Sequence, residues 1–491
     1  MPKLKKWQRN LARLVVFCLL AGLLLIYTDR VLWDKKGTIM GFYEEPKNSI
    51  DVLYLGGSHS NAAIAPTQMY EQHGFTGYVL YSWSQPIWTS YHYLLEGLKT
   101  QQPKVVVLDS FGLVYGHTYI TDTDINSVSN EWSLLIPPSV NRIQLAIAMS
   151  RSQTDHLPFY SYFSLFQYHN RWKAITQEDL LWPLQSYATT GKGYGPLYTT
   201  EAFDPVTMPP DTPANGLMEP QCLSYLQKII DLSKEEGFQL VLATLPYVAN
   251  EEEFGIYQQA YELCRQNDVP VVDYFDEATA EAAGFDWQTD MAEHAHVNYK
   301  GAAKISAHLG NWLAQQFSLP DHRGEAAYVH WDEAAAAERK NLKDMDLKMS
   351  AELEVLLAKA ADPDYTAILL TKGELTQSDP TAMQEAYESV HLAADVFAEN
   401  TCGLSILREG AVYEQQTASM GAALTPQKPL DGAGYTLTAQ TDGDTASVLL
   451  NGEEVCLNRP GINAVVIDTA SGRLVQSISF DAQHEYAPFT D

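Results

Sequence analysis

The sequence predicts an α/β protein whose doubly wound, mostly parallel sheet follows an N-terminal transmembrane helix and precedes a second, smaller β-rich α+β domain. Three observations support this prediction. An apolar stretch flanked by basic residues opens the chain. Short β-branched runs then alternate with helical patterns from about residue 48 to 318, as in doubly wound sheets. Beyond residue 363, strand-like runs separated by glycine and aspartate turn signals predict the second domain.

The composition indicates a globular protein that does not bind nucleic acid. The chain has 491 residues, more than one ordinary core can hold, so several domains are expected. Hydrophobic residues make up 46% of the chain and charged residues 19%, which are values of folded proteins. The formal net charge of -29 repels polyphosphates from most of the surface, so nucleic-acid partners are excluded.

The N-terminal apolar stretch, LVVFCLLAGLLLIY (Leu14–Tyr27), predicts a membrane anchor. A spanning helix needs roughly 20 mostly apolar residues, so the flanking residues must contribute to the span. No small-x-small cleavage site follows, which favours an uncleaved anchor over a cleaved signal peptide. Because the basic residues precede the stretch, residues 1–33 are expected to form a cytoplasmic tail and a single span in the cell membrane, with the bulk of the chain extracytoplasmic.

The five cysteines indicate neither a zinc site nor a fold that depends on disulfides. Cys18 lies in the predicted anchor, and the other four show no CxxC or close histidine spacing. Pairing of Cys222 with Cys264, and of Cys402 with Cys456, is left open.

The α/β domain, residues 48–318, is predicted to present a serine at the end of its first strand. The strand IDVLYL runs directly into Gly56-Gly57-Ser58-His59. Ligands of doubly wound sheets bind at the carboxyl ends of the strands, so Ser58 is expected where ligands bind. Residues 115–215 interrupt the strand-helix alternation and are interpreted as an insertion that either shapes the site or only elaborates the fold.

A catalytic serine needs a base, which must come from a distant part of the chain. The segment FDWQTDMAEHAHVNYKG places Glu293 three residues before His296, with Asn298 and a predicted helix after it. Gly-x-Ser-His after the first strand, with acid-x-x-His-x-Asn-x-x-Gly before the last helix, resembles the SGNH/GDSL hydrolase superfamily. More narrowly, the chain looks like its membrane-anchored bacterial members, such as the D-alanyl-transfer and alginate O-acetylation proteins.

This resemblance implies an SGNH-like fold over residues 48–318 and a serine mechanism. It assigns Ser58 as the nucleophile, His296 as the general base and Glu293 as the acid that orients the base. Members of the superfamily usually have aspartate at the last position, and Asp290 is the alternative acid. The resemblance implies no metal and no organic cofactor.

The oxyanion donors of the superfamily have no clear counterparts in this sequence. YSWSQP occupies the second block, where Ser82, Ser84 or Gln85 would donate only if the loop turns inward. The other candidates for oxyanion or site-lining roles are Gly57, His59, Asp290 and Asn298.

Two polar clusters have alternative interpretations. His294 and His296, together with Glu293 and Asp290, would form a metal site if they converged, although the catalytic interpretation is favoured. HNRW (His169–Trp172) would contact a sugar or an anionic acyl acceptor if it lay at the site, and would otherwise belong to a packed insertion.

Residues 319–362 are rich in helix formers and predict a helical linker to the second domain, residues 363–491. In that domain, Ala446–Asp481 resembles the carbohydrate-binding ILEI/PANDER domain, with NG, NRPGIN, VVID and FD as the carrying motifs. The order of its parts suggests a circular permutation. The resemblance implies glycan binding, with Arg459 and Asn463 as the first candidates, and a small β-rich packing module is the alternative.

These predictions favour an anchored, extracytoplasmic SGNH-type O-acyltransferase or esterase. It would act on O-acyl groups of cell-surface polysaccharide through a serine acyl-enzyme, with acetyl as the expected acyl group. If the enzyme transfers the group, the resemblance implies a multipass membrane acyltransferase as its partner. The alternatives are a lipid or small-ester esterase and a non-catalytic glycan-binding scaffold.

Overall fold

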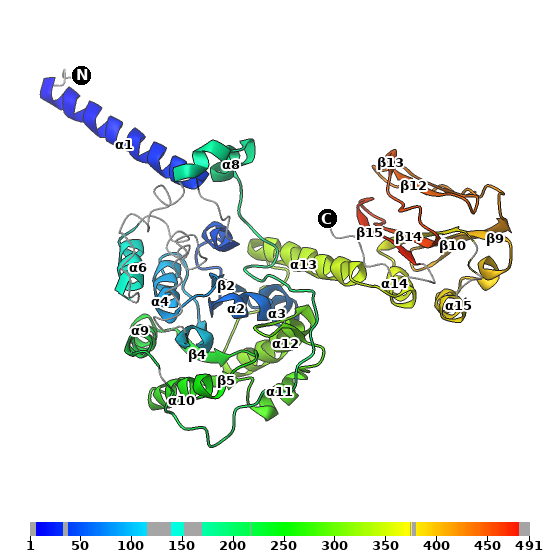
Figure 1. Ribbon diagram of the computed structural model, residues 1–491. Coiled ribbons are helices and arrows are strands. Elements are labelled where there is room, and N and C mark those ends of the chain that lie inside the picture. Colours follow the sequence, from blue (N-terminus) through cyan, green and yellow to red (C-terminus); the bar gives the residue numbers. More distant parts are fainter. Residues whose placement is uncertain are drawn as a thin grey trace. The chain divides into compact units, whose positions relative to one another are not determined.

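The computed structural model describes residues 6–32, 38–114, 139–151, 169–216, 218–373, 375 and 380–480. The chain divides into two compact units, Met1–Arg339 and Lys340–Asp491 (Figure 1). Much of the predicted insertion, residues 115–138 and 152–168, lies outside the described residues. The candidate catalytic residues all belong to the first unit.

The first helix, α1 (Lys6–Leu32), contains the N-terminal apolar stretch and is 27 residues long. It is long and apolar enough to cross a membrane, a test that a signal sequence would also pass. Its apolar side chains are exposed along most of its length, from Leu11 at 51% to Ile26 at 49%. Continuous exposed apolar surface of this kind suits lipid better than water.

A five-stranded parallel sheet forms the centre of the first unit, with the strand order β2-β1-β3-β4-β5. This sheet confirms the predicted α/β class. β1 and β3 are buried along their whole length, because central strands of such sheets are covered on both faces. The strands are β1 (Val52–Gly56), β2 (Gly77–Tyr81), β3 (Val105–Asp109), β4 (Gln239–Thr244) and β5 (Val271–Asp273).

Helices cover both faces of this sheet. In Figure 1, α4 and α9 lie on one side of it, and α3 and α12 lie on the other. The helices are α2 (Ser58–Ala63), α3 (Pro66–His73), α4 (Ile87–Gly97), α6 (Val140–Arg151), α8 (Gln177–Leu181), α9 (Pro220–Glu236), α10 (Glu251–Gln266), α11 (Glu277–Ala283), α12 (Tyr299–Gln316) and α13 (Val329–Lys348), with 3-10 turns η1 (Thr38–Glu44), η2 (Ser110–Leu113), η6 (His169–Ala174), η7 (Trp182–Leu184) and η8 (Ala326–Tyr328).

The strand order reverses between β1 and β3, which makes their carboxyl ends the topological switch point of the sheet. The chain passes from β1 to β2 on one side and then returns to β3 on the other side of β1. Such a switch point is where doubly wound sheets bind ligands. β1 ends at Gly56, two residues before Ser58, and β3 ends at Asp109. The topology therefore brings Ser58 and Asp109 to the same edge of the sheet.

A short antiparallel hairpin precedes the last helix of the α/β fold. Its strands are β6 (Met291–Glu293) and β7 (His296–Val297), and they pair Glu293 with His296. Asn298 then caps α12, accepting hydrogen bonds from the backbone N–H groups of Lys300 at 2.9 Å and Gly301 at 3.1 Å. The cap ends the hairpin immediately after the histidine.

The second unit contains a five-stranded antiparallel sheet and a smaller three-stranded sheet. The larger sheet has the order β10-β9-β8-β14-β15 and the smaller one β11-β12-β13. Its elements are α14 (Leu353–Ala360), β8 (Tyr365–Lys372), α15 (Pro380–Ser389), η10 (Ala394–Phe397), β9 (Thr401–Arg408), β10 (Ala411–Ser419), β11 (Leu437–Thr441), β12 (Ala446–Leu450), β13 (Glu453–Glu454), β14 (Gly461–Asp468) and β15 (Leu474–Phe480).

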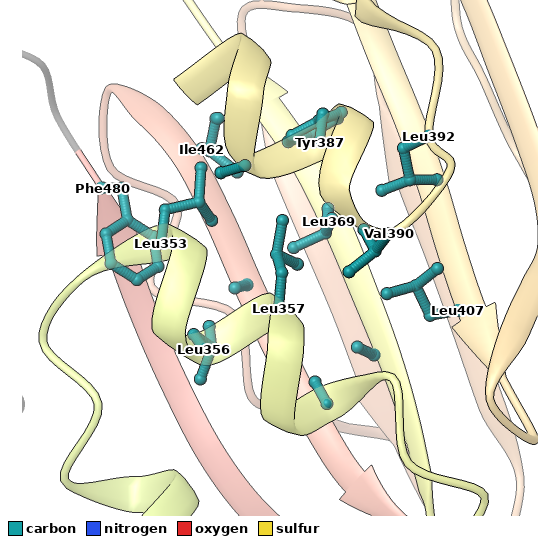
Figure 2. Packing of buried hydrophobic residues seen from close by; sticks show 14 of the residues in the cluster. Leu353, Leu356, Leu357, Leu369, Tyr387, Val390, Leu392, Leu407, Ile462 and Phe480 are labelled. Atoms are coloured by element: carbon teal, nitrogen blue, oxygen red, sulfur yellow. The ribbon is translucent and has the colours of Figure 1, made fainter. Parts of the chain in front are cut away.

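The larger sheet separates two apolar cores. Figure 2 shows the first, in which Leu353, Leu356 and Leu357 of α14 pack against the sheet beside Tyr387 of α15. Alternate residues of β8 divide between the cores: Leu369 faces the helices, whereas Ile368 joins the second core with the small sheet. The second unit is therefore a three-layer arrangement of helices, sheet and sheet.

The second unit begins earlier than the predicted boundary at residue 363. The predicted linker, residues 319–362, includes α14. Leu356 and Leu357 of this helix are fully buried in the first of the two cores. Helix propensity alone does not reveal such packing, because a linker helix and a core helix have the same local pattern. The compact unit accordingly starts at Lys340, within α13.

All five cysteines are free thiols, so neither of the two open pairings is formed. Cys222, Cys264, Cys402 and Cys456 are buried and act as small apolar residues, whereas Cys18 is exposed on α1.

Asn463 is a structural residue of the second unit rather than a glycan contact. It is only 1% exposed, its side-chain oxygen accepts from the Arg459 N–H at 2.9 Å, and its amide donates to the Arg459 carbonyl at 2.7 Å. The resemblance implies a sugar contact for Asn463, but folding turns this amide inward to satisfy the backbone of the preceding turn.

Replacing Asn463 with alanine should loosen the second unit. The two backbone groups of Arg459 would lose their hydrogen bonds to this amide, which contribute about 0.5 to 1.5 kcal/mol each. Hydrogen exchange of the full chain should become faster in the β14 and β8 peptides of Asn463→Ala. Gln440→Ala, on the exposed face of β11, is the control and should exchange like the wild type. Unchanged exchange in Asn463→Ala would show that this amide has no structural role.

Candidate active site

Ser58 is presented by a tight turn from β1 into α2. Gly57 occupies the N-cap position of α2, and Ser58 is its first residue. A Cβ at Gly56 would lie 2.0 Å from Ser60 Oγ and 2.6 Å from the Cβ of Asp109, so only glycine fits there. A Cβ at Gly57 would meet only ordinary contacts, the nearest 3.5 Å away. Gly56 is thus the glycine on which the turn depends.

Ser58, His296 and Glu293 form a continuous hydrogen-bonded chain. The Ser58 Oγ and the His296 Nε2 are 2.7 Å apart, although 238 positions separate the two residues. The His296 Nδ1 is hydrogen-bonded to a carboxylate oxygen of Glu293. The His296 side chain is 22% exposed and that of Glu293 35%, so the group is reachable from solvent. This is the arrangement of nucleophile, base and orienting acid that activates a serine.

The hairpin of β6 and β7 makes the acid-base pair a local structure. Glu293 and His296 are paired across the hairpin, and the second oxygen of Glu293 accepts from the Ala295 N–H at 3.0 Å. Two residues, His294 and Ala295, form the connection. Sequence spacing of three is therefore enough to place the carboxylate beside the imidazole.

The electrostatics of Glu293 favour the ionised form. Partial burial raises the pKa of Glu293, but the Ala295 N–H and the His296 ring lower it more, and the net pKa lies below the usual value. An ionised Glu293 accepts the Nδ1–H of His296, which leaves Nε2 as the acceptor that faces the Ser58 hydroxyl. That tautomer is the one able to remove a proton from serine.

Asp290 and Asn298 hold the hairpin and do not reach the reacting atoms. Asp290 is 1% exposed and pairs with Lys304 at 2.6 Å, away from His296. The Asn298 amide is buried and donates to the carbonyl oxygens of Thr289 at 2.8 Å and Met291 at 3.2 Å, besides capping α12. The alternative acid and the site-lining role for Asn298 are therefore wrong: both residues are structural.

His59 forms part of a buried aromatic wall behind the triad. Its ring centroid lies 3.7 Å from that of Phe111, 5.2 Å from that of Tyr247 and 5.0 Å from that of His296. Burial above all, with the nearby His296, holds the pKa of His59 well below its usual range, so the ring is neutral. Within the described residues neither ring nitrogen has a hydrogen-bond partner. His59 thus borders the site, as one of the site-lining candidates.

The loop after β2 approaches Gly57 with its backbone rather than with the Gln85 side chain. Gln85 is fully buried, donating to Ser90 Oγ at 2.9 Å and accepting from Ser82 Oγ at 2.8 Å. The Ser82 hydroxyl proton is thereby used within the loop, and the Gln85 side chain is held by Ser82 and Ser90. Ser84 adopts a left-handed conformation with φ 51°, which is uncommon for a residue other than glycine. The Gln85 backbone nitrogen is the atom of this loop nearest to the Gly57 position.

Asp109, at the end of β3, is a residue of the site that the sequence analysis missed. Its carboxylate accepts from the Ser60 hydroxyl at 3.1 Å and from the Phe111 N–H at 3.0 Å, and the nearby Gly57 N–H also favours its ionised form. It is 3% exposed, and burial raises its pKa to about 6. The only sequence signal was an aspartate closing the apolar run VVVLD. Asp109 holds the turn that carries Ser58, and so it is a positioning residue.

The two alternative polar clusters do not form the sites considered for them. Glu293 bonds to His296 through one carboxylate oxygen, and its other oxygen lies 2.9 Å from Nδ1 of His294, whose side chain is 78% exposed. Asp290 pairs with Lys304 instead. In the described part of the chain, no three His, Cys, Asp or Glu side chains are grouped to hold a metal. The HNRW segment lies in η6 beside the end of α1, where Arg171 pairs with Asp179 at 3.0 Å.

Comparison with known proteins finds similar structures but no similar sequence. No family model and no curated protein matches the chain. A provisionally assigned acylhydrolase of Bacteroides fragilis NCTC 9343 is 11% identical, with 58% of this chain and 99% of that one covered and a TM-score of 0.30. A GDSL-like lipase of Bacteroides thetaiotaomicron VPI-5482 is 9% identical over 54% and 88%, with a TM-score of 0.28. An acetyl xylan esterase, AlAXEase, is 11% identical over 54% and 98%, with a TM-score of 0.26. Likenesses with TM-scores this low assign no function to this chain.

Glu293→Gln should slow the reaction of Ser58 strongly. A glutamine amide facing Nδ1 donates a hydrogen bond and favours the tautomer with its proton on Nε2, which cannot accept the serine proton. The rate of fluorophosphonate labelling should fall by up to about 10⁴-fold, the scale of tautomer loss in serine triads. Asp290→Asn is the matched control: it should lower the melting temperature and leave the labelling rate of folded protein near that of the wild type. Equal losses in both variants would contradict the assignment of Glu293.

Asp109→Asn should change the pH dependence of stability in a defined direction. The folded-state pKa of about 6 lies above the ordinary 3.8, so the native state binds more protons between these values and the wild type loses stability as pH rises through them. The variant lacks this loss, which amounts to about 3 kcal/mol for a shift of this size. The melting temperature of Asp109→Asn minus that of the wild type should therefore increase from pH 4 to pH 7.

Two further measurements complete that test. Asp211→Asn, at an exposed loop position, should show no such pH-dependent difference. Labelling of Ser58 should be slower in Asp109→Asn, because only one of the two accepting oxygens remains and at least one hydrogen bond to the serine turn is lost. A pH-independent difference in melting temperature would refute the buried, ionising carboxylate.

Proposed function

We propose that this chain is a membrane-anchored, extracytoplasmic serine O-acyltransferase or esterase of the SGNH type. Its proposed substrates are O-acyl groups, acetyl in the first place, on cell-surface polysaccharide. The observation that carries the proposal is the hydrogen-bonded chain from Ser58 Oγ through His296 to Glu293, with 2.7 Å between the serine oxygen and Nε2. A serine that serves only as a turn residue needs no such alignment with two distant groups.

In the first half-reaction, the Ser58 oxygen attacks the ester carbonyl carbon while its proton passes to His296 Nε2. The resulting imidazolium lies against the ionised Glu293. When the tetrahedral intermediate collapses, the bond to the leaving alkoxide breaks and Nε2 returns the proton to that oxygen. The acyl group is then an ester of Ser58.

In the second half-reaction, a sugar hydroxyl or water attacks the acyl-enzyme. His296 Nε2 removes the proton of the attacking hydroxyl. It returns this proton to the Ser58 oxygen as the ester bond between that oxygen and the acyl carbon breaks. Water as acceptor gives hydrolysis, and a glycan hydroxyl gives transfer. The half-buried position of the triad allows either acceptor to approach.

Backbone N–H groups are the proposed oxyanion donors. The Gly57 N–H faces Asp109, and the buried Gln85 side chain is bonded to Ser82 and Ser90. This leaves the Ser58 N–H and the backbone of the loop around Ser84 and Gln85 as the groups to stabilise the oxyanion. Each such donor typically contributes about 2.7 to 4 kcal/mol to transition-state binding.

The cellular setting of the proposal comes from the two ends of the chain. The exposed apolar surface of α1, with basic residues before it, supports an uncleaved anchor with a cytoplasmic N-terminus. If the enzyme transfers acyl groups, a multipass membrane acyltransferase is the proposed partner that supplies them. Glycan binding by the second unit is proposed from its sequence resemblance, with Arg459 as the side chain to test.

Labelling of the full chain in detergent with a fluorescent fluorophosphonate tests the proposal. The wild type should become labelled, and Ser58→Ala should not. His296→Ala should be slower by several orders of magnitude, because the serine loses its base. Ser224→Ala, at an exposed position of α9, is the control and should label like the wild type. Absence of labelling in a folded wild type would refute the enzyme and favour a glycan-binding scaffold.

The same variants separate the substrate classes. Release of acetate from acetylated polysaccharide, or its transfer to a deacetylated acceptor, should require Ser58. Faster turnover of p-nitrophenyl octanoate than of the acetate ester, with no action on polysaccharide, would instead favour a lipid or small-ester esterase.

A further inference from the structure

An exposed apolar patch lies on the first unit next to the end of α1, outside the candidate active site. It consists of Trp172 of η6, Leu180 and Leu181 of α8, and Leu184 of η7, which are 64%, 46%, 46% and 75% exposed. Large apolar side chains grouped in this way on a folded unit mark a surface that meets another apolar body. We refer to these four residues as the apolar platform.

Hydrogen bonds attach the platform to the last turns of α1. The Tyr27 hydroxyl donates to the Leu180 carbonyl at 2.7 Å, and the Arg171 guanidinium donates to the Leu32 carbonyl at 3.3 Å. Elements η6, α8 and η7 all contact α1, and Figure 1 shows α8 beside its C-terminal end. The platform is thus continuous with the exposed apolar surface of the helix.

The charged side chains of Arg171 and Asp179, next to the apolar platform, pair with each other, whereas the four platform side chains are exposed. Asp179 is 2% exposed, accepts from Arg171 at 3.0 Å and closes a capping box with Thr176. The Asp179 carboxylate and the Arg171 guanidinium therefore neutralise each other on the inner side of α8. Leu180 and Leu181 lie on its exposed side. The exposed Lys173 and Glu178 beside the patch have opposite charges, so apolar area is its main attraction.

The position of Tyr27 sets the depth of the platform. The exposed apolar run of α1 ends at Ile26, and Tyr27 follows it directly. Tyrosine is characteristic of the zone where the hydrocarbon core meets the headgroups. The remaining residues to Leu32 rise by only about 8 Å, comparable with the thickness of that zone on one face of a bilayer. Leu180, bonded to Tyr27, therefore lies at the level of the interface.

We propose that the apolar platform rests on the lipid bilayer that α1 spans, and that it docks the first unit on the outer face of the membrane. This inference rests on the proposed membrane anchor and not on the proposed ester chemistry. The anchor and the platform together give the unit two attachments to the bilayer, which restrict how it can turn about the helix.

Environment-sensitive labels on the full chain in lipid nanodiscs test this proposal. Cys18→Ala removes the exposed thiol, and the other cysteines are buried, so a single introduced cysteine can carry a nitrobenzoxadiazole label. Leu184→Cys and Leu180→Cys probe the platform. Leu223→Cys on α9, 42% exposed, is the matched control, and Leu20→Cys probes the span of α1.

Labels at positions 184, 180 and 20 should emit at shorter wavelength than the label at 223 and be quenched by nitroxide-bearing lipids. If position 20 is quenched but 184 and 180 behave like 223, the anchor stands and the platform proposal is overturned. A blue shift at 184 without lipid quenching would mean that protein covers the patch, which also overturns it. If position 20 is not quenched either, the anchor itself is wrong and the platform with it.

Discussion

The hydrogen bond between Ser58 and His296 is the interaction around which the first unit is organised. It joins residues 238 positions apart, and each partner is held by its own local structure. The serine is carried by a turn that only a glycine at position 56 permits, and the histidine by a hairpin that pairs it with Glu293. A parallel sheet with a switch point at β1 and β3 is what brings these two local structures to one edge.

The surroundings of this hydrogen bond place buried polar groups where a merely stable protein would have apolar ones. Asp109 is almost fully buried, with a raised pKa, and His59 is buried and neutral. Both are costly to bury, and both touch residues next to the nucleophile. Active sites commonly retain such unfavourable groups, because the geometry they impose is worth more to the reaction than the stability they remove.

The two units have their polar residues in different roles. In the first unit, Asp109, Glu293 and His296 converge at the open edge of a parallel sheet. In the second unit, Asn463 is buried and its amide satisfies the backbone groups of Arg459 in a neighbouring turn. The apolar platform adds a third kind of surface, since the charges beneath it pair with each other and its leucines are 46% to 75% exposed.

The sequence by itself determined the alternation of strands and helices, the apolar first helix, and the local pair of Glu293 with His296, because each of these depends on residues close together in the chain. It also pointed to Ser58, since a glycine-rich turn after a buried strand is a local signal. Only the tertiary structure decided that Ser58 meets His296, that Asp109 supports the serine turn, and that Asp290, Asn298 and Asn463 are structural. It likewise decided that α14 belongs to the core of the second unit. The physical reason is that a polar residue's partners, and a helix's burial, depend on which distant segments fold against it, and local pattern carries no information about that choice.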